Sequence, residues 1–184
     1  MINVGFVLPS SEYLHDPFRG DPHTQIYMLT HIKSRLKGVR PQLIDLRGVK
    51  KEFAIRHIPE CDAYLHSVYT LDYDEQVEIV RNIRQNYPKA KHIAGGPHVS
   101  EFPDESLNVF DSIVLGEGEE EVIDAIDDFQ NSGLKSRYEQ SESIDINKYP
   151  FSLRKYLPKS SVARKNMMTL KSKPENAEIF GTTV

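Results

Sequence analysis

The sequence predicts an α/β fold in which a parallel β-sheet carries helices on both faces. Short apolar runs alternate with longer amphipathic stretches along most of the chain, and several runs are followed by a proline or glycine, as at Pro9, Gly95 and Gly116. This alternation is typical of buried parallel strands joined by crossover helices. A length of 184 residues, of which 39% are hydrophobic, allows one such domain and an appendage.

Five apolar runs are the predicted strands. The run at residues 2–8 is almost wholly apolar and ends at Pro9, as expected for a strand buried on both faces. The other strands are predicted at residues 42–46, within 62–69, at 91–94 and at 112–115. The strand order 2-1-3-4-5 is preferred, which makes the predicted fold a flavodoxin-like (Rossmann-like), doubly wound, five-stranded parallel sheet.

The stretches between the strands have helical periodicity. Ile26, Leu29, Ile32 and Leu36 fall on one face of a helix predicted at residues 24–37. Further helices are predicted at residues 74–87, where Pro88 ends the helix, at residues 103–110, and from Glu119 to near Gly133.

Composition excludes several classes of protein. A net charge of −4 argues against nucleic acid as a partner, because phosphate binding needs a basic face. The apolar runs are too short to cross a bilayer, and the start lacks the layout of a signal peptide. Cys61, the one cysteine, excludes an internal disulfide framework and a cysteine-rich metal site. These features predict a soluble cytoplasmic protein without a membrane partner.

Residues with small side chains follow the predicted strands at their carboxyl ends. In open parallel sheets ligands bind beyond these ends, so the clustering predicts a ligand site there. The long loop after the first strand, residues 10–22, joins this edge, and long loops in compact domains tend to be functional. The small residues are Ser67 after the third strand, Gly95 and Gly96 after the fourth, and Gly116 and Gly118 after the fifth.

Each glycine motif also has an ordinary structural explanation. The segment Gly95-Gly96-Pro97-His98 permits close approach of a flat ligand, and it equally permits a tight turn. The segment Gly116-Glu117-Gly118-Glu119 lacks the third glycine of a dinucleotide fingerprint. Its glutamates are favoured by the dipole of the following helix and would repel a phosphate.

Other chemistries have little support in the sequence. Asp21-Pro22-His23 pairs a carboxylate with a histidine, as metal sites do, but a helix cap with a surface histidine is the preferred interpretation. A response-regulator receiver needs an acidic pair after the first strand, an aspartate after the third and a lysine after the fifth, and these residues are missing. No G-x-S-x-G elbow, H-E-x-x-H or phosphate-binding P-loop occurs.

Two segments taken in order carry a resemblance to a known family. The first, at residues 95–105, begins Gly95-Gly96-Pro97-His98, and the second, at residues 110–119, ends Gly116-Glu117-Gly118-Glu119. They are similar to the G-G-x-H and D-x-[IV]-[IV]-x-G-E-G-E segments of the amino-terminal domain of cobalamin-binding radical SAM proteins. The likeness covers roughly residues 1–130.

The resemblance implies a cobalamin-binding domain at residues 1–133, whose ligand lies across the strand ends with its nucleotide tail in a slot lined by Ser67, Gly95 and Gly96. It implies that residues 134–184 are a linker to a radical SAM barrel, whose first strand would begin at residue 179. The barrel binds a [4Fe–4S] cluster and S-adenosylmethionine, with methyl transfer as the expected chemistry. The cluster motif C-x-x-x-C-x-x-C is absent, so this chain is not expected to be catalytic alone. The candidate cofactor-binding residues are Ser10, Ser67, Val68, Tyr69, Gly95, Gly96, Pro97, His98, Gly116, Glu117 and Gly118.

Two departures from the family leave an alternative open. Tyr69 stands in the last place of the family's S-x-L element. Ile26 replaces the glycine of the D-x-H-x-x-G motif of cobalamin mutases, so His23 is not expected to ligate cobalt. The alternative function is a cofactor-free module that recognises or docks substrate for the barrel; an FMN carrier is disfavoured because no phosphate loop follows the first strand. The basic stretch after residue 150 is predicted to be a solvated linker.

Overall fold

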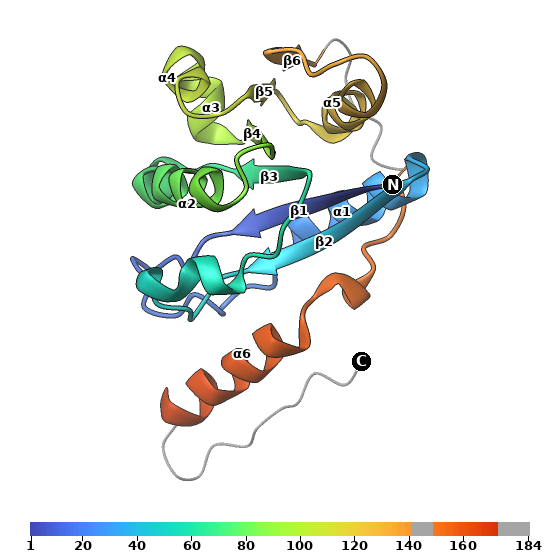
Figure 1. The fold of residues 1–184 in the computed structure, drawn as a ribbon. Coiled ribbons are helices and arrows are strands. Elements are labelled where there is room, and N and C mark those ends of the chain that lie inside the picture. The colour runs from blue at the N-terminus through green and yellow to red at the C-terminus, as the bar shows by residue number, and fades with distance from the viewer. Residues whose placement is uncertain (141–148, 173–184) are drawn as a thin grey trace.

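The structure is a computed structural model that describes residues 1–140 and 149–172, the last seven of these by their helical backbone alone. Its centre is a six-stranded parallel sheet with the order β2-β1-β3-β4-β5-β6 (Figure 1). The predicted doubly wound α/β fold is therefore confirmed, with one strand more than expected. The strands are β1 (Ile2–Leu8), β2 (Val39–Asp45), β3 (Ala63–Ser67), β4 (Lys91–Gly95), β5 (Ser112–Leu115) and β6 (Arg137–Glu139).

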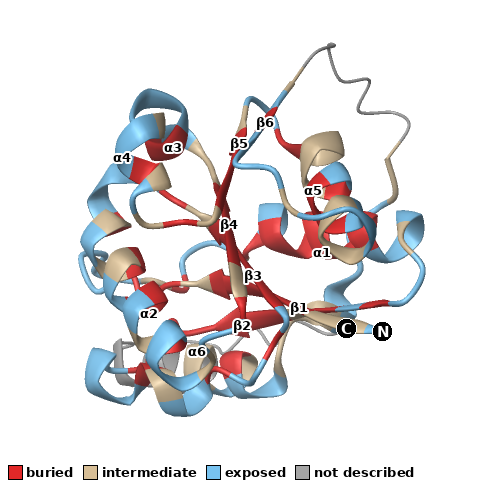
Figure 2. Cartoon of the chain, turned by 45° about the horizontal axis from the view of Figure 1, so that its top comes forward, coloured by how far each residue is buried: buried red, intermediate tan, exposed pale blue. Residues whose placement is uncertain are grey.

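Helices cover both faces of the sheet. The first face carries α1 (His23–Arg35) and α5 (Glu119–Asn131), which pack together with Val4, Phe6 and Val114. The second face carries α2 (Tyr73–Asn86), α3 (Pro97–Glu101), α4 (Pro103–Leu107) and the 3₁₀-helix η1 (Lys51–His57). Figure 2 shows the buried strands between these two layers. Two short 3₁₀-helices, η2 (Thr70–Asp72) and η4 (Arg154–Tyr156), and α6 (Lys159–Ser172) complete the described elements.

Alternation along each strand divides the core between the two faces. Val4 and Phe6 of β1 face α1 and α5, whereas Val7 packs with the η1 and α2 side. Gly5 between them also faces the second side, where a Cβ atom would lie 2.5 Å from Ile44 Cδ1. Both sets are buried because helices lie on both sides, which explains why the strands are apolar without a polar face.

The sheet extends beyond the predicted domain end at residue 133. β6 pairs in parallel with β5, and its one inward side chain, Tyr138, is buried and donates a hydrogen bond to Asp128 Oδ2 at 3.0 Å. A strand of three residues with a single buried side chain gives no apolar run, so the sequence pattern did not reveal it.

The described part of the predicted solvated linker is mostly exposed, but it contacts the domain at several points. Tyr149 lies edge-on to His31 of α1, with ring centroids 4.7 Å apart. The Leu153 N–H donates to Thr30 Oγ1 at 2.9 Å, and α6 then lies beside β2, the edge strand (Figure 1). The strand predicted to begin at residue 179 lies outside the described residues. No helix in the described ranges is long and apolar enough to cross a membrane.

Two histidines are buried beneath the second face of the sheet. His66 Nδ1 lies 2.9 Å from Gln76 Oε1, and His66 Nε2 lies 3.1 Å from His92 Nδ1. With Gln76 accepting, two neutral rings satisfy these two contacts, His92 donating to His66 and His66 donating to Gln76, while His92 Nε2 has no hydrogen-bond partner among the described residues. Burial lowers the pKa of His66 to about 4 and also lowers the pKa of His92. The fold therefore holds both rings uncharged.

We expect this pair to make the domain labile to mild acid. In the unfolded chain both histidines bind protons near pH 6.5, whereas in the folded chain they do so only at lower pH. The unfolded state thus gains protons first, and the free energy of unfolding falls by about 1.5 kcal/mol per histidine between pH 6.5 and pH 5. Urea unfolding across this range measures the loss.

A His92→Leu variant should lose about half of this pH dependence. His57→Gln, at an exposed position of η1, is the matched control and should keep all of it. Equal slopes in the wild type and His92→Leu would show that the buried pair does not control the acid response.

Candidate functional site

A cavity of about 450 Å³ opens at the carboxyl ends of β3, β4 and β5. The cavity lies between the sheet and helices α1 and α5, because both the strands and these helices contribute residues to its walls. The apolar part is formed by Phe6, Leu65, Ile93 and Val114 of the strands with Met28 of α1 and Val122 of α5. The volume falls within the range of about 300–1,000 Å³ that is usual for small-molecule sites.

The solvent side of the cavity is polar, and among the residues that the structure describes it carries no positive side chain. Hydroxyl groups come from Thr24, Ser67, Tyr69 and Ser100, and the one ionisable carboxyl group is that of Glu117. No lysine or arginine is among the lining residues. Several phosphates would therefore lack charge partners here, whereas an apolar ring with neutral polar substituents would find both surfaces it needs.

Most of the predicted site residues do meet at this cavity. Eight of the eleven candidates line it, and they come from three strand ends and the loops that follow them. They are Ser67, Tyr69, Gly95, Gly96, Pro97, Gly116, Glu117 and Gly118. The other three, Ser10, Val68 and His98, are not among its lining residues.

The apolar part of the cavity has no signal in the sequence. It is formed by Phe6, Leu65, Ile93 and Val114, whose apolar side chains are equally typical of the core of a buried strand. What they share is one face of the sheet near the carboxyl ends of their strands, a relation that becomes visible only when the register of the strands is known.

His66 also borders the cavity and was not singled out as a site residue. Both of its ring nitrogens are engaged by Gln76 and His92, so it has no free nitrogen for a metal. Gln76 in turn donates a long hydrogen bond of 3.5 Å to the carbonyl oxygen of Ser67. In the described ranges no group of three histidine, cysteine, aspartate or glutamate side chains is arranged to hold a metal ion.

Gly96 is required by the backbone of the neighbouring strand end. It has φ +103°, a conformation that side chains rarely adopt. A Cβ atom at this position would lie 2.9 Å from the carbonyl oxygen and 3.0 Å from the nitrogen of Val68. Of the two interpretations left open for this motif, a tight turn therefore accounts for Gly96 by itself, although the residue also lines the cavity.

Val68 and His98 are not lining residues, but their hydrogen bonds position the strand ends beside the cavity. The Val68 N–H donates to Gly95 O at 2.8 Å, and the Val68 carbonyl accepts the His98 N–H at 3.1 Å. The buried His98 ring stacks on Tyr73 at 4.1 Å between centroids, and its Nδ1 lies 3.2 Å from Thr70 Oγ1. These contacts fix the ends of β3 and β4 relative to each other.

Ser10 is buried just after the end of β1 and contacts an acidic residue that is not among those lining the cavity. Its N–H donates to Glu75 Oε1 at 2.6 Å, and its hydroxyl has no hydrogen-bond partner among the described residues. Nearby, Asp72 Oδ1 accepts the Tyr69 N–H at 3.0 Å, and burial raises the pKa of Asp72 to about 6. The two carboxyl groups hold the loops that follow β1 and β3.

The rim formed by the start of α5 is acidic. The Glu117 N–H donates to Gln140 Oε1 at 2.9 Å, which ties the Gly116–Gly118 turn to the end of β6. Burial raises the pKa of Glu119, and the carboxylates of Glu117 and Glu121 add to the effect. This negative charge disfavours an anionic ligand group beside α5.

His23 is exposed at the first turn of α1, next to Thr24 of the cavity. The neighbouring Asp21 carboxylate accepts a hydrogen bond from Lys165 Nζ at 3.0 Å, and this bond lowers the pKa of Asp21. A carboxylate is one of the groups that orient a metal-binding histidine, and in this structure the Asp21 carboxylate is bonded to Lys165.

Comparison with known proteins defines the class of fold. No family model and no curated protein matches the sequence. Among solved structures, the chain is similar to the isolated receiver (REC) domain of RcsB from Salmonella enterica serovar Typhimurium, with a TM-score of 0.50, 10% identity, and coverage of 77% of this chain and 94% of that one. The N-terminal domain of a hypothetical protein from Thermotoga maritima matches with a TM-score of 0.45 and 26% identity over 70% of this chain and 99% of that one. The chain is a flavodoxin-like, receiver-like α/β domain.

The likeness to a receiver domain concerns the fold alone. Ser10 and Ser11 follow β1, Ser67 ends β3, and Gly116 follows β5. A receiver would need carboxylates at the first two places and a lysine at the third. The chain therefore lacks the groups for phosphoryl transfer to an aspartate at this edge.

We predict that Gly96→Ala destabilises the fold by about 2–4 kcal/mol, since the new Cβ atom meets the Val68 backbone and the residue must keep a positive φ. Gly20→Ala is the matched control, because a Cβ atom there has no neighbour within 4 Å. It should change the free energy of unfolding by no more than about 0.5 kcal/mol. Equal stabilities of the two variants in urea unfolding would contradict the tight approach at Gly96.

Proposed function

We propose that this chain is a cobalamin-binding domain that receives the nucleotide tail of the corrinoid in the cavity at the strand ends. In this proposal the domain belongs to a larger enzyme, in which it is followed by a radical SAM domain that binds a [4Fe–4S] cluster and S-adenosylmethionine. The observation that carries it is an apolar cavity opening at the very turns, Gly95–Gly96 and Gly116–Gly118, on which the resemblance to that family rests.

The residues fit such a ligand in size and polarity. The apolar walls at Leu65, Ile93 and Val114 suit a flat heterocyclic base, which gains by leaving water. The hydroxyl groups of Ser67 and Tyr69 at the solvent side suit the sugar and the single phosphate of the tail, which needs fewer charge partners than a dinucleotide. Bound cobalamin would supply a methyl carrier, and this chain would orient it.

A cofactor-free recognition or docking module is the second candidate. It is supported by exposed apolar side chains on the segments that follow β3 and β4, namely Tyr69, Leu71 and Phe102, of which Leu71 is 77% exposed. Such exposed apolar groups are typical of surfaces that meet another protein. Under this alternative the same edge of the sheet would contact a protein surface and retain no corrinoid.

Titration with hydroxocobalamin, followed by visible spectroscopy and gel filtration, tests the proposal. We expect the folded chain to change the corrinoid spectrum and to retain the corrinoid on the column. Val122→Trp should weaken binding about tenfold or more, because the larger ring fills the cavity from α5.

Val77→Trp is the matched control. Val77 is a partly buried valine like Val122, but it lies on α2 on the opposite face of the sheet. This variant should bind as the wild type does, and circular dichroism establishes that both variants are folded. A folded wild-type chain that leaves the spectrum unchanged and retains no corrinoid refutes the proposal and supports the docking module. Equal binding by both variants would assign the corrinoid to another site.

A further inference from the structure

A buried ion pair joins Asp45, the last residue of β2, to Arg47, and it contacts segments that are distant in the sequence. The Arg47 guanidinium donates to the Asp45 carboxylate through Nε at 3.0 Å and through Nη2 at 2.8 Å. Both residues are almost fully buried, Arg47 being 5% and Asp45 6% exposed. A buried pair of this kind is stable only while its remaining hydrogen-bonding groups are also satisfied.

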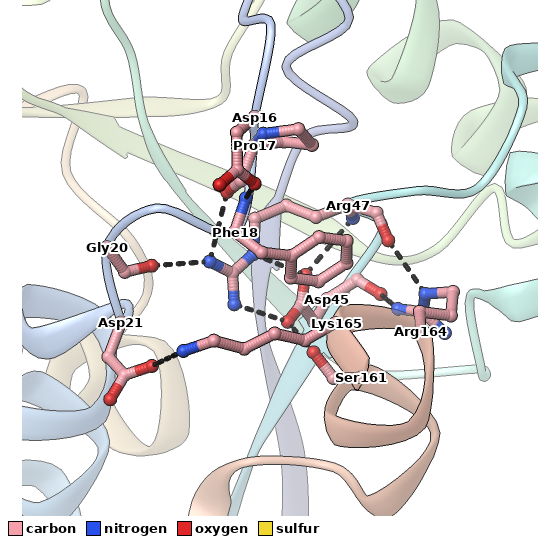
Figure 3. Close-up of polar contacts among 10 residues, drawn as sticks. All are labelled: Asp16, Pro17, Phe18, Gly20, Asp21, Asp45, Arg47, Ser161, Arg164 and Lys165. Atoms are coloured by element: carbon pink, nitrogen blue, oxygen red, sulfur yellow. Dashed lines mark hydrogen bonds and ion pairs between the residues drawn. The ribbon is translucent and has the colours of Figure 1, made fainter. Parts of the chain in front are cut away.

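The loop after β1 satisfies one side of the pair. Arg47 Nη1 donates to the carbonyl oxygens of Gly20 at 2.8 Å and of Pro17 at 3.3 Å. The guanidinium also lies 4.9 Å above the ring of Phe18, which is buried (Figure 3). Arg47 is thus the group that holds the long loop of residues 10–22 against β2.

Helix α6 satisfies the other side. Ser161 Oγ donates to Asp45 Oδ2, and Arg164 Nε donates to the carbonyl oxygen of Arg47 at 2.7 Å. Lys165 reaches past the pair to Asp21 of the loop (Figure 3). The spacing of Ser161, Arg164 and Lys165 sets all three on one side of the helix, so a single helix face makes these contacts.

We propose that the Asp45–Arg47 pair couples the docking of α6 to the order of the loop after β1. When α6 undocks, the loop of residues 10–22 loses its order as well. When α6 leaves, Asp45 loses the Ser161 hydroxyl and the pair meets water. Hydration then competes with the hydrogen bonds from Arg47 to Pro17 and Gly20, and the loop loses its anchor. Coupling between two equilibria is reciprocal, so loosening the loop must equally weaken the docking of α6.

Two adjacent serines provide a matched test by hydrogen–deuterium exchange with mass spectrometry on the full chain. Ser161 is 1% exposed and faces Asp45, whereas Ser160 is exposed. Ser161→Asp brings a second carboxylate against Asp45 and should undock α6 by repulsion. We expect amides of both α6 and residues 10–22 to exchange about tenfold faster in Ser161→Asp, and at the wild-type rate in Ser160→Asp.

The reverse arm uses Phe18→Ala, which removes the ring beneath Arg47 and should speed exchange in α6. Unchanged exchange in β3 (Ala63–Ser67) establishes that the domain remains folded in each variant. Faster exchange of α6 in Ser161→Asp with an unchanged loop would overturn the coupling. Wild-type exchange of α6 in Ser161→Asp would overturn the docking contact itself.

Discussion

The close approach of Gly96 to the backbone of Val68 is the constraint on which the candidate site depends. It lets the Val68 amide bond to Gly95 and the Val68 carbonyl bond to the first turn of α3, so the chain leaves β4 toward the second face of the sheet. α3 packs on the second face, and Gly96, Pro97 and Ser100 of this turn line the cavity. The cavity between the sheet and helices α1 and α5 opens at the strand ends beside this turn.

The chemistry of the cavity follows from which residues this arrangement brings together. Strand alternation directs Leu65, Ile93 and Val114 to one face, while the neighbouring His66 and His92 turn to the other and share a hydrogen bond. The acidic start of α5 adds negative charge to the rim, and among the described residues no lysine or arginine lines the cavity to offset it. The lining residues therefore offer apolar contact and neutral hydrogen bonds, which disfavours a site built around several phosphates.

The sequence predicted the core of the fold well because its strongest signals are local. Residues 2–8 and 112–115 were predicted as strands with the bounds that the structure has, and the glycine turns were expected at the edge where they lie. β6 and the contacts of residues 149–165 with the domain were missed because they depend on distant segments of the chain. The apolar part of the cavity was missed for a different reason: a strand residue beside a ligand and a strand residue in a core have the same side chain.

Polar groups outside the cavity stabilise, at separate points, the loops that surround it. Glu75 holds the end of β1 through Ser10, Asp72 holds the turn after β3, and the pair of Asp45 and Arg47 holds the loop between β1 and α1. Each is a buried or half-buried charge that bonds to backbone groups, and such bonds define a loop more sharply than apolar contact does. The loops at this edge are therefore ordered by contacts within this chain, those of α6 included, which is the condition for a ligand site that is formed before its ligand binds.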